Sequence, residues 1–369
     1  KVKMSWKNDL SKNITKAEEL KLYLQLSEEK TKKISQVTDK FPMSIPHYYL
    51  SLIDKSNEED PIRRMCVPSG YEEDTCGSFD TSGETENTVI SGLQHKYKQT
   101  ALILSTNNCA MYCRHCFRKR LVGLDDDEIA KNIKPMTDYI SSHEEISNVL
   151  ITGGDSFMLS NTRIEDYLKA LTKIGHLDFI RFGTRTPVVL PKRITEDDEL
   201  IEILSRYCKI KQIFVVTQFN HKNEFTDESK KAIKKLINHN IPVLNQTVLL
   251  KGVNDSAESL ADVFKELTSA GAIPYYLFQC RPVSGVKDRF QVPFIRAYEI
   301  VEGAKKLQNG IGKSFRYCMS HVTGKIEILG PEGDKMLFKY HEAKYDKDFN
   351  RIFSLKIDKD TCWIGDDEI

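Results

Sequence analysis

The sequence predicts an α/β fold on a parallel sheet, curved into a full or partial barrel or left open. Six short apolar runs alternate with amphipathic stretches between residue 101 and about residue 308, and buried parallel strands have this character. Each run and the stretch after it occupy about 35 residues, the size of a right-handed strand–helix crossover. Function in such sheets gathers at the carboxyl ends of the strands. The six runs are residues 101–105, 148–152, 178–183, 211–217, 242–250 and 274–279.

Periodic apolar residues indicate the helices between these strands. The clearest helix has apolar side chains at Leu260 and at the positions three, four and seven residues later, which share one helical face. Asp255 and Glu258 stand before it in the pattern of a capping box, so the sequence predicts that this helix begins there.

Three parts are expected along the chain: a helical accessory segment (1–90), the core (91–310) and a β-rich tail (311–369). In the first part, residues 14–37 are expected to be mainly helical. Residues 72–86 are polar, acidic and rich in Gly, Ser and Thr, which predicts a loop or linker that carries no chemistry. In the tail, short alternating strands are expected to pack elsewhere or to mediate assembly; they are residues 325–329, 335–340 and 353–357.

Composition excludes several classes of protein. The 54 basic and 53 acidic residues leave a net charge of +1, so no bulk attraction to nucleic acid or to an anionic membrane is expected. No stretch approaches the ~20 apolar residues needed to span a bilayer. Residues 1–16 lack the apolar centre of a secretory signal, so a cytoplasmic protein is expected. The start without Met indicates a trimmed or incomplete terminus.

Three of the nine cysteines, Cys109, Cys113 and Cys116, crowd together directly after the first predicted strand. This odd-numbered group predicts metal chemistry in a reducing compartment. Three thiolates can hold three irons of a cubane iron–sulfur cluster and leave the fourth iron open to a small ligand. The C-x3-C-x2-C spacing resembles that of radical S-adenosylmethionine (SAM) enzymes, in which the methionine end of SAM takes the open position. The alternative is a zinc site completed by His115, although adjacent residues rarely fit one tetrahedron well.

Thr152, Gly153, Gly154 and Asp155 end the second predicted strand. Two glycines allow a tight turn and a close approach to a ligand, and Asp155 can accept a hydrogen bond from a cationic amine. An ordinary strand-to-helix turn has the same composition. Behind the cysteine motif, however, the segment resembles the glycine-rich stretch that holds the methionine amino group in radical SAM proteins.

Seven segments together resemble the lysine 2,3-aminomutase family over roughly residues 5–330. They are FPMSIPHYYLSLID (41–54), CRHCFRKR (113–120), TGGD (152–155), RTPVVLP (185–191), FNH (219–221), NQTVLLKGVND (245–255) and PYYLFQC (274–280). This resemblance implies a partial (β/α)6 barrel of the radical SAM type with a helical N-terminal extension, a [4Fe–4S] cluster, SAM and pyridoxal 5′-phosphate (PLP). It also implies an isomerase that moves the amino group of an L-α-amino acid to the β-carbon.

The resemblance assigns cofactor roles to individual residues. Lys325 stands where the family has a glycine-rich loop ending in its PLP lysine, although most of those glycines are missing here. Lys96 and Tyr97 align with residues near the PLP phosphate, with Lys96 in place of an arginine. Gln246 aligns with a residue near the SAM ribose, and Gln218 replaces a family histidine there.

The expected substrate pocket departs from that of a lysine enzyme. Arg118 corresponds to the arginine that binds the substrate α-carboxylate; the alternative is that it belongs to a solvated basic run. Where lysine enzymes place two aspartates for the distal ammonium, this chain has Arg281 and Cys318. Arg281 would repel an ammonium by several kcal/mol and suits a carboxylate, unless it turns to solvent or meets an acidic neighbour such as Asp288. Glutamate or another acidic amino acid is therefore expected in place of lysine.

The expected function is a SAM- and PLP-dependent amino acid 2,3-aminomutase. Alternatives within the same chemistry are a lysine 2,3-aminomutase, a β-lysine synthase that serves a translation factor, and a radical enzyme that has lost PLP. The alternative from another class is a non-catalytic iron–sulfur redox or interaction protein. Expected partners are an amino acid substrate, an electron donor of the ferredoxin or flavodoxin type and further copies of the chain, without nucleic acid or membrane. Only Cys362 lies where family members carry a C-terminal zinc-binding cysteine cluster, so no such zinc is expected.

Overall fold

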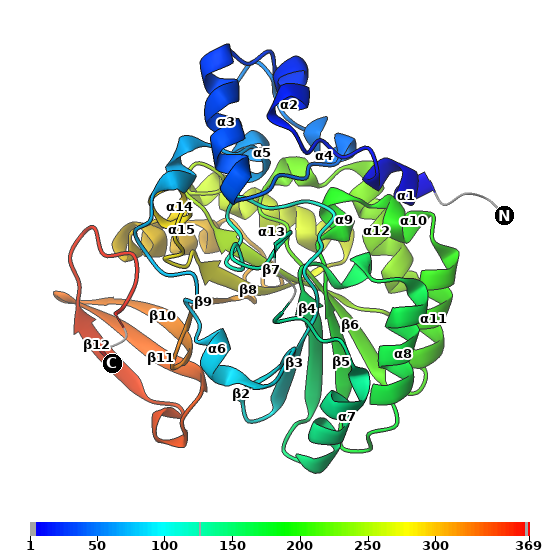
Figure 1. Cartoon of the computed structure of the whole chain (residues 1–369). Helices are drawn as coiled ribbons and strands as arrows, with labels where there is room; N and C mark the ends of the chain where they lie inside the picture. The colour runs from blue at the N-terminus through cyan, green and yellow to red at the C-terminus, as the bar shows by residue number, and fades with distance from the viewer. Residues whose placement is uncertain (1–4, 125–126, 366–367) are drawn as a thin grey trace.

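One twelve-stranded sheet forms the centre of the computed structural model, which describes residues 5–124, 127–365 and 368–369 (Figure 1). The strands lie in chain order; β3 to β9 run parallel, whereas β1–β3 and β9–β12 pair antiparallel. The strands are β1 (Thr88–Ile90), β2 (Leu93–Tyr97), β3 (Thr100–Thr106), β4 (Asn148–Gly153), β5 (Phe179–Gly183), β6 (Gln212–Thr217), β7 (Val243–Leu249), β8 (Ile273–Gln279), β9 (Arg316–His321), β10 (Gly324–Glu332), β11 (Lys335–Ala343) and β12 (Ile352–Lys356).

The predicted parallel strands are confirmed as β3 to β8, and the barrel is partial because the sheet keeps two free edges, β1 and β12. A further parallel strand, β9, was not predicted. It begins with the exposed Arg316 and contains Ser320, so its sequence lacks the continuous apolar run that identified the other strands.

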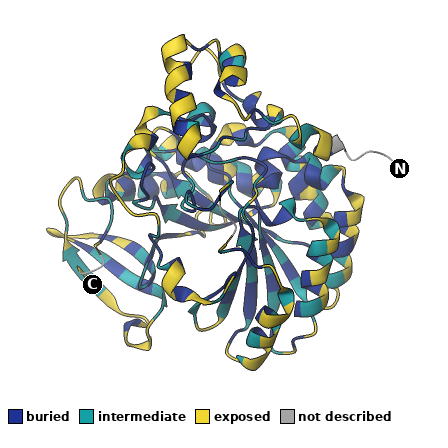
Figure 2. Ribbon diagram, viewed as in Figure 1, coloured by how far each residue is buried: buried dark blue, intermediate teal, exposed yellow. Residues whose placement is uncertain are grey.

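Helices cover the outer face of the parallel strands, and their exposed residues face away from the sheet (Figure 2). These helices are α7 (Ile133–Ser142), α8 (Asn161–Leu171), α9 (Thr186–Val189), α10 (Lys192–Thr195), α11 (Asp198–Cys208), α12 (Asp227–Asn238), α13 (Ala257–Ala270), α14 (Lys287–Phe290) and α15 (Phe294–Lys306). Short 3-10 turns lie at η2 (Ser156–Met158), η3 (Lys222–Glu224) and η4 (Asp346–Asp348).

The predicted helix near Leu260 is α13, but its predicted cap is wrong by one residue. Ser256, not Asp255, is the N-cap, and its hydroxyl accepts a hydrogen bond from the backbone N–H of Ser259 at 3.1 Å. Aspartate and serine both cap helices well, so the sequence offered two adjacent candidates of similar strength.

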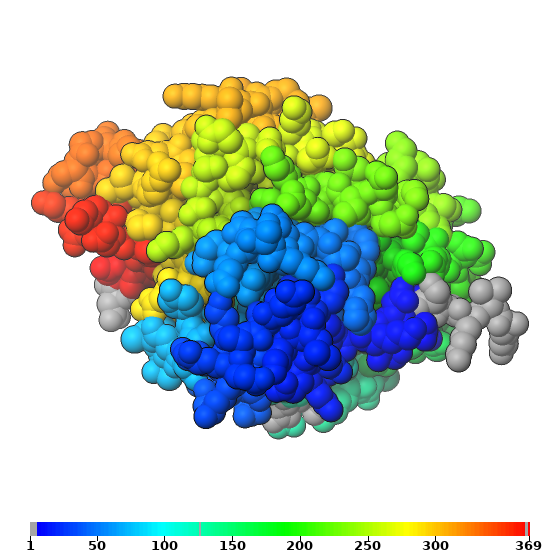
Figure 3. All heavy atoms as spheres, turned by 90° about the horizontal axis from the view of Figure 1, so that it is seen from above, coloured from blue at the N-terminus to red at the C-terminus, as the bar shows by residue number. Residues whose placement is uncertain are grey.

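The N-terminal extension is helical, as predicted, but breaks into two main helices, α2 (Ala17–Leu24) and α3 (Glu28–Lys40). Gln25 turns the chain in a left-handed conformation between them. The shorter helices of this extension are α1 (Ser5–Leu10), α4 (His47–Leu50) and α5 (Pro61–Cys66). Seen from above, the extension covers one face of the molecule (Figure 3). It touches the cysteine loop directly, because the Tyr112 N–H donates to Ser44 O at 3.0 Å.

Residues 72–86 are mostly loop, as predicted, but two of their carboxylates are buried and paired. Two short helical turns lie in this segment, η1 (Gly70–Glu73) and α6 (Glu84–Asn87). Glu72 and Glu84 are buried, and they form ion pairs with Arg114, inside the cysteine motif, and with Arg118, just after it. Composition marked the segment as a loop, but it could not show that two of its carboxylates turn inward.

The tail forms β10, β11 and β12, which confirms the predicted strands. They do not pack as a separate unit; they continue the central sheet beyond β9 by antiparallel pairing. Within the described residues, no helix is both long enough and apolar enough to cross a membrane.

Candidate active site

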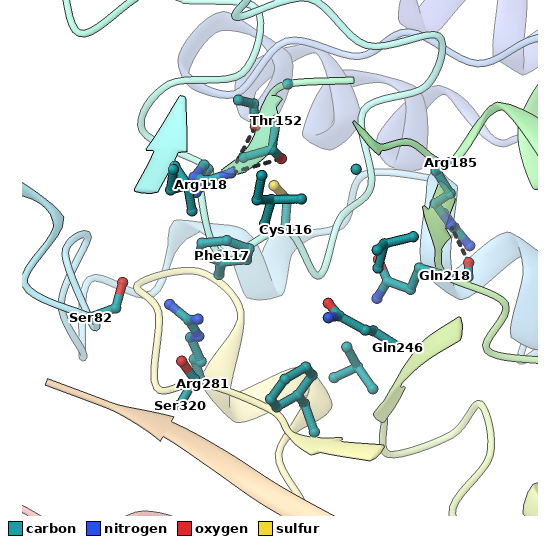
Figure 4. Close-up of a pocket in the computed structure, with 18 of the residues that line it drawn as sticks. Ser82, Cys116, Phe117, Arg118, Thr152, Arg185, Gln218, Gln246, Arg281 and Ser320 are labelled. Atoms are coloured by element: carbon teal, nitrogen blue, oxygen red, sulfur yellow. Dashed lines mark hydrogen bonds between the residues drawn. The ribbon is translucent and has the colours of Figure 1, made fainter. Parts of the chain in front are cut away.

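A cavity of about 360 Å³ lies inside the curved sheet and is lined by side chains from most of its strands. This volume is typical of a small-molecule site. Of the residues that the sequence placed near a cluster, cofactor or substrate, Cys318 is buried and does not line the cavity, whereas the others do: Lys96, Tyr97, Cys109, Cys113, Cys116, Arg118, Thr152, Gly153, Gly154, Asp155, Gln218, Gln246, Arg281 and Lys325. Figure 4 shows several of them converging from different strands and loops.

The turn after β4 packs directly on the start of the cysteine loop. The Gly154 N–H donates to Thr106 O at 2.5 Å, and the Asp155 N–H donates to Asn108 O at 2.8 Å. A Cβ on Gly153 would lie 2.3 Å from Thr106 O, and Gly153 also has a φ of +122°. These glycines therefore allow the β4 turn to approach the cysteine loop closely.

The three cysteines of the loop are half-buried and face the same cavity. Burial, Asp155 and the neighbouring thiols raise the pKa of Cys109, and burial with Cys113 raises that of Cys116 to about 11. Arg185 donates from Nη1 to Cys113 Sγ at 2.8 Å. Its cationic guanidinium thus stabilises negative charge on that sulfur.

His115 lies in the cysteine motif and contacts Asn220 and Phe290. Its Nε2 is 3.3 Å from Asn220 Nδ2, and its ring packs edge-on against Phe290. Burial, with Arg185 and Lys119, lowers its pKa well below the usual range, so the ring is neutral. Over the described residues, no three His, Cys, Asp or Glu side chains are arranged to hold a single metal ion.

Asp155 is buried, and other groups of the protein already occupy its carboxylate. It accepts hydrogen bonds from the Phe157 N–H at 3.0 Å, the Thr184 hydroxyl at 2.6 Å and the Arg185 N–H at 2.7 Å. Burial raises its pKa, although these hydrogen bonds act in the opposite direction. The carboxylate thus joins the β4 turn to the end of β5.

Arg118 projects toward the end of β4 and is held by a carboxylate that the sequence did not reveal (Figure 4). Its Nε donates to Glu84 Oε1 at 2.9 Å, and its Nη1 donates to Gly153 O at 3.1 Å. Glu84 also pairs with Arg120, at 2.9 Å. Burial alone would raise the pKa of Glu84, but the two arginines lower it to about 2. The carboxylate is ionised, and it fixes the guanidinium of Arg118.

Lys325 lies on β10 with its ammonium at the cavity wall. It pairs with Glu342 Oε2 at 2.7 Å and lies over the ring of Tyr276 at 4.4 Å. Lys96 is nearby on β2 and donates to the backbone oxygens of Ser82 and His321. Burial, with Arg281, Lys344 and Lys325, lowers the pKa of Lys96 to about 7.

Arg281 follows β8 and extends across the cavity toward Phe117, whose ring lies 4.1 Å from the guanidinium carbon (Figure 4). Its Nη1 is buried, and no hydrogen-bond partner for it exists among the described residues. Burial, which outweighs the attraction of Glu84, lowers the pKa of Arg281 to about 10. The expected alternative partner Asp288 is close to Asp74 and Lys287 instead.

The charges around the cavity are unequal. Six cationic side chains line it, against the three carboxylates of Glu84, Asp155 and Glu342; the cations are Lys96, Arg118, Arg181, Arg185, Arg281 and Lys325. Besides Arg281 Nη1, the buried donors Gln94 Nε2 and Arg181 Nε have no partner within the described part of the chain. Buried donors of this kind favour a ligand that brings acceptors and negative charge.

Sequence reasoning missed four charged residues of this site: Glu84, Arg181, Arg185 and Glu342. Arg185 opens one of the family-like segments and could have been found there. Glu84 lies in a segment of loop-like composition, and Glu342 lies in the tail beyond the resemblance. No signal in the sequence distinguished these two glutamates from exposed ones.

The sequence matches the Radical SAM superfamily over residues 103–264, from β3 into α13. It is 38% identical over 350 residues to a provisionally named L-lysine 2,3-aminomutase of Aquifex aeolicus, covering 94% of this chain and 93% of the relative. It is 37% identical over 317 residues to the L-lysine 2,3-aminomutase of Acetoanaerobium sticklandii, with 85% and 74% coverage. It is also 37% identical over 309 residues to the glutamate 2,3-aminomutase of Clostridioides difficile, with 83% and 72% coverage.

These matches agree with the cysteine loop, the glycine turn and the partial barrel that surround the cavity. Radical SAM proteins use a [4Fe–4S] cluster and SAM, and 2,3-aminomutases are isomerases. The chain therefore belongs to the lysine 2,3-aminomutase family of radical SAM enzymes.

Proposed function

We propose that this chain is a PLP-dependent 2,3-aminomutase whose substrate is an L-α-amino acid with an acidic side chain, such as glutamate. The buried guanidinium of Arg281 carries this proposal, because it enters the cavity without a carboxylate partner among the described residues. A substrate carboxylate would neutralise it with bidentate geometry, whereas a substrate ammonium would be repelled.

Cys109, Cys113 and Cys116 are the proposed ligands of the cluster. Their soft thiolates, grouped on one loop at the cavity wall, suit iron and leave one iron without a protein ligand. Arg185 supplies positive charge at Cys113, and His115 Nε2 lies 3.3 Å from Asn220 Nδ2. We infer that the electron comes from a donor of the ferredoxin or flavodoxin type.

Thr152, Gly153, Gly154, Gln218 and Gln246 are the proposed SAM contacts, because they line the cavity beside the cysteine loop. We propose a structural role for Asp155 in place of the expected hydrogen bond to the amine of a ligand. Since its carboxylate is occupied by Phe157, Thr184 and Arg185, it supports the site by fixing the β5 end.

Lys325 is the proposed attachment point for PLP, and Lys96 and Tyr97 are the proposed contacts of its phosphate. The fit rests on the amine of Lys325, which lines the cavity, and on the half-buried ammonium of Lys96 nearby. Burial, Arg281 and Lys344 lower the pKa of Lys96, and Lys325 adds to this effect. When bound, the cluster with SAM supplies a carbon radical that removes a substrate hydrogen, and PLP supplies a π-system that delocalises the unpaired electron.

The side chains of this protein then have the tasks of binding, orientation and exclusion of water. Arg118, held by Glu84, is proposed to receive the α-carboxylate. Arg281 is proposed to receive the side-chain carboxylate; its guanidinium, like that of Arg118, lies against the ring of Phe117. Two fixed guanidinium groups at the two ends of a dicarboxylate would orient its β-carbon.

The test is anaerobic incubation of reconstituted protein with a reductant, SAM, PLP and a panel of amino acids, followed by mass spectrometry of the β-isomers. Glutamate is expected to be isomerised with a higher kcat/KM than lysine. Arg281→Met should lower kcat/KM for glutamate by about 30-fold or more, equivalent to roughly 2 kcal/mol, mainly through KM.

Arg316→Met is the matched control, because Arg316 is half-exposed and pairs with Glu327 outside the cavity. It should leave both constants unchanged. Efficient lysine turnover with no response to glutamate would contradict the proposal and favour a lysine or translation-factor enzyme.

A further inference from the structure

Lys325 and Glu342 face each other across the β10–β11 ladder. They are directly opposite in the antiparallel register, and Lys325 Nζ lies 2.7 Å from Glu342 Oε2. The lysine side chain is 13% exposed and the glutamate 34%, and both line the cavity. The pair is therefore a wall of the site, unlike the many ion pairs on the outer surface.

The backbone fixes this juxtaposition. A Cβ added to Gly324 would lie 2.3 Å from Glu342 O, so the two strands approach too closely here for any larger residue. The rings of Tyr276 and Tyr97 lie 4.4 Å and 5.6 Å from the ammonium and restrict it further. The pairing of β10 with β11 therefore places the carboxylate of residue 342 beside residue 325, and no loop has to become ordered first.

Several other charged or titratable groups surround the ammonium. Lys96 and Arg181 add positive charge, and Glu342 is the carboxylate in contact with it. Lys325 also lowers the pKa of Glu342 against the effect of burial. The groups near Lys325 are Lys96 and Tyr97 on β2, Tyr276 on β8, Cys318 on β9, and His341 and Glu342 on β11. Arg181 on β5 acts on Glu342, and Glu327 on β10 acts on Cys318 and His341.

We propose that Glu342 is a positioning residue for Lys325: it aims the nitrogen into the cavity and stabilises positive charge on that nitrogen when PLP is attached. The inference rests on the proposed role of Lys325. Through Glu342, the tail strand β11 would contribute a side chain to the active site.

The test uses full-length protein with PLP alone, so that no radical chemistry is needed. Bound PLP is followed by its visible absorbance while the pH is raised, and its affinity is measured by titration. Removing the carboxylate charge with Glu342→Gln should shift the pH midpoint of the absorbance change downward by roughly one unit or more, because the protonated nitrogen loses its counter-charge. PLP binding should weaken about tenfold.

Two variants serve as controls. Glu332→Gln makes the same charge change at an exposed position of β10 and should leave the midpoint and affinity as in the unaltered chain. Glu342→Asp keeps the charge and should recover most of the midpoint, which a purely structural role would not require.

The outcomes separate the inference from the proposed function. A band that Lys325→Ala abolishes, with the same midpoint in Glu342→Gln as in the unaltered chain, overturns the role of Glu342 and leaves that of Lys325. If the unaltered chain shows no band that depends on Lys325, both fail. A downward shift in Glu342→Gln, restored by Glu342→Asp, supports the inference.

Discussion

At the scale of single residues, buried carboxylates organise the cations of this site. Glu84 holds Arg118 and Arg120 beside the cavity, and Glu72 accepts hydrogen bonds from Arg114 and Lys119 behind the cysteine loop. A buried ion pair adds little net stability, but loss of one partner leaves an uncompensated charge. These glutamates therefore fix the geometry of the site more than they stabilise the fold.

Glu84→Gln should lower the free energy of unfolding at neutral pH by about 3–5 kcal/mol, because the buried guanidinium of Arg118 loses its counter-charge, whereas the half-buried Arg120 keeps Glu128 as a partner. The pKa of Glu84 is lowered from 4.5 to about 2, so its ionised form stabilises the fold fully above pH 4.5. That contribution is lost as the pH falls from 4.5 through about 2. The difference in the free energy of unfolding between the unaltered chain and Glu84→Gln should therefore shrink over this pH range.

Chemical denaturation at several pH values measures this difference. Glu86→Gln is the control, because Glu86 pairs with Lys344 at the surface and is 69% exposed. Its cost should stay under about 1 kcal/mol. Equal costs for the two substitutions would contradict the role given to Glu84.

At the scale of elements, the turn after β4 and the cysteine loop form one unit. The sequence identified both by their motifs, and the strands β3 to β8 by their apolar runs, because a parallel sheet buries both faces of its strands. It could not identify β9, whose Arg316 and Ser320 interrupt the pattern, or the exact cap of α13. Nor could the sequence show that Gly154 contacts the cysteine loop, because its partner there, Asn108, lies 46 positions earlier in the chain.

Gly154→Ala should displace the cysteine loop, because the added Cβ would lie 2.4 Å from Asn108 O. We expect the iron content after anaerobic reconstitution to fall and SAM affinity, measured by calorimetry, to drop at least tenfold. Gly175→Ala is the matched control, since no atom lies within 4 Å of the added Cβ there. Unchanged iron content and SAM affinity in Gly154→Ala would show that the loop does not depend on this turn.

At the scale of the whole molecule, both ends of the chain complete a site that begins in the central sheet. The extension contacts the cysteine loop from outside: Arg114, inside the motif, donates to Pro42 O at 2.8 Å and to Phe41 O at 3.2 Å. The tail continues the sheet and brings Lys325 and Glu342 to the cavity. The sequence predicted a helical extension and a β-rich tail. It could not predict that both contact the central site, because contacts between residues far apart in the chain leave no local sequence pattern.

The central claim is that Cys109, Cys113 and Cys116 hold a cluster with one iron open to SAM. Electron paramagnetic resonance of anaerobically reconstituted, reduced protein tests it directly. We predict a [4Fe–4S] signal that changes when SAM is added and that is lost on replacing any of the three cysteines by alanine, but retained in Cys76→Ala, which alters an exposed cysteine. A signal that SAM leaves unchanged, or one that survives each of the three replacements, would contradict the account.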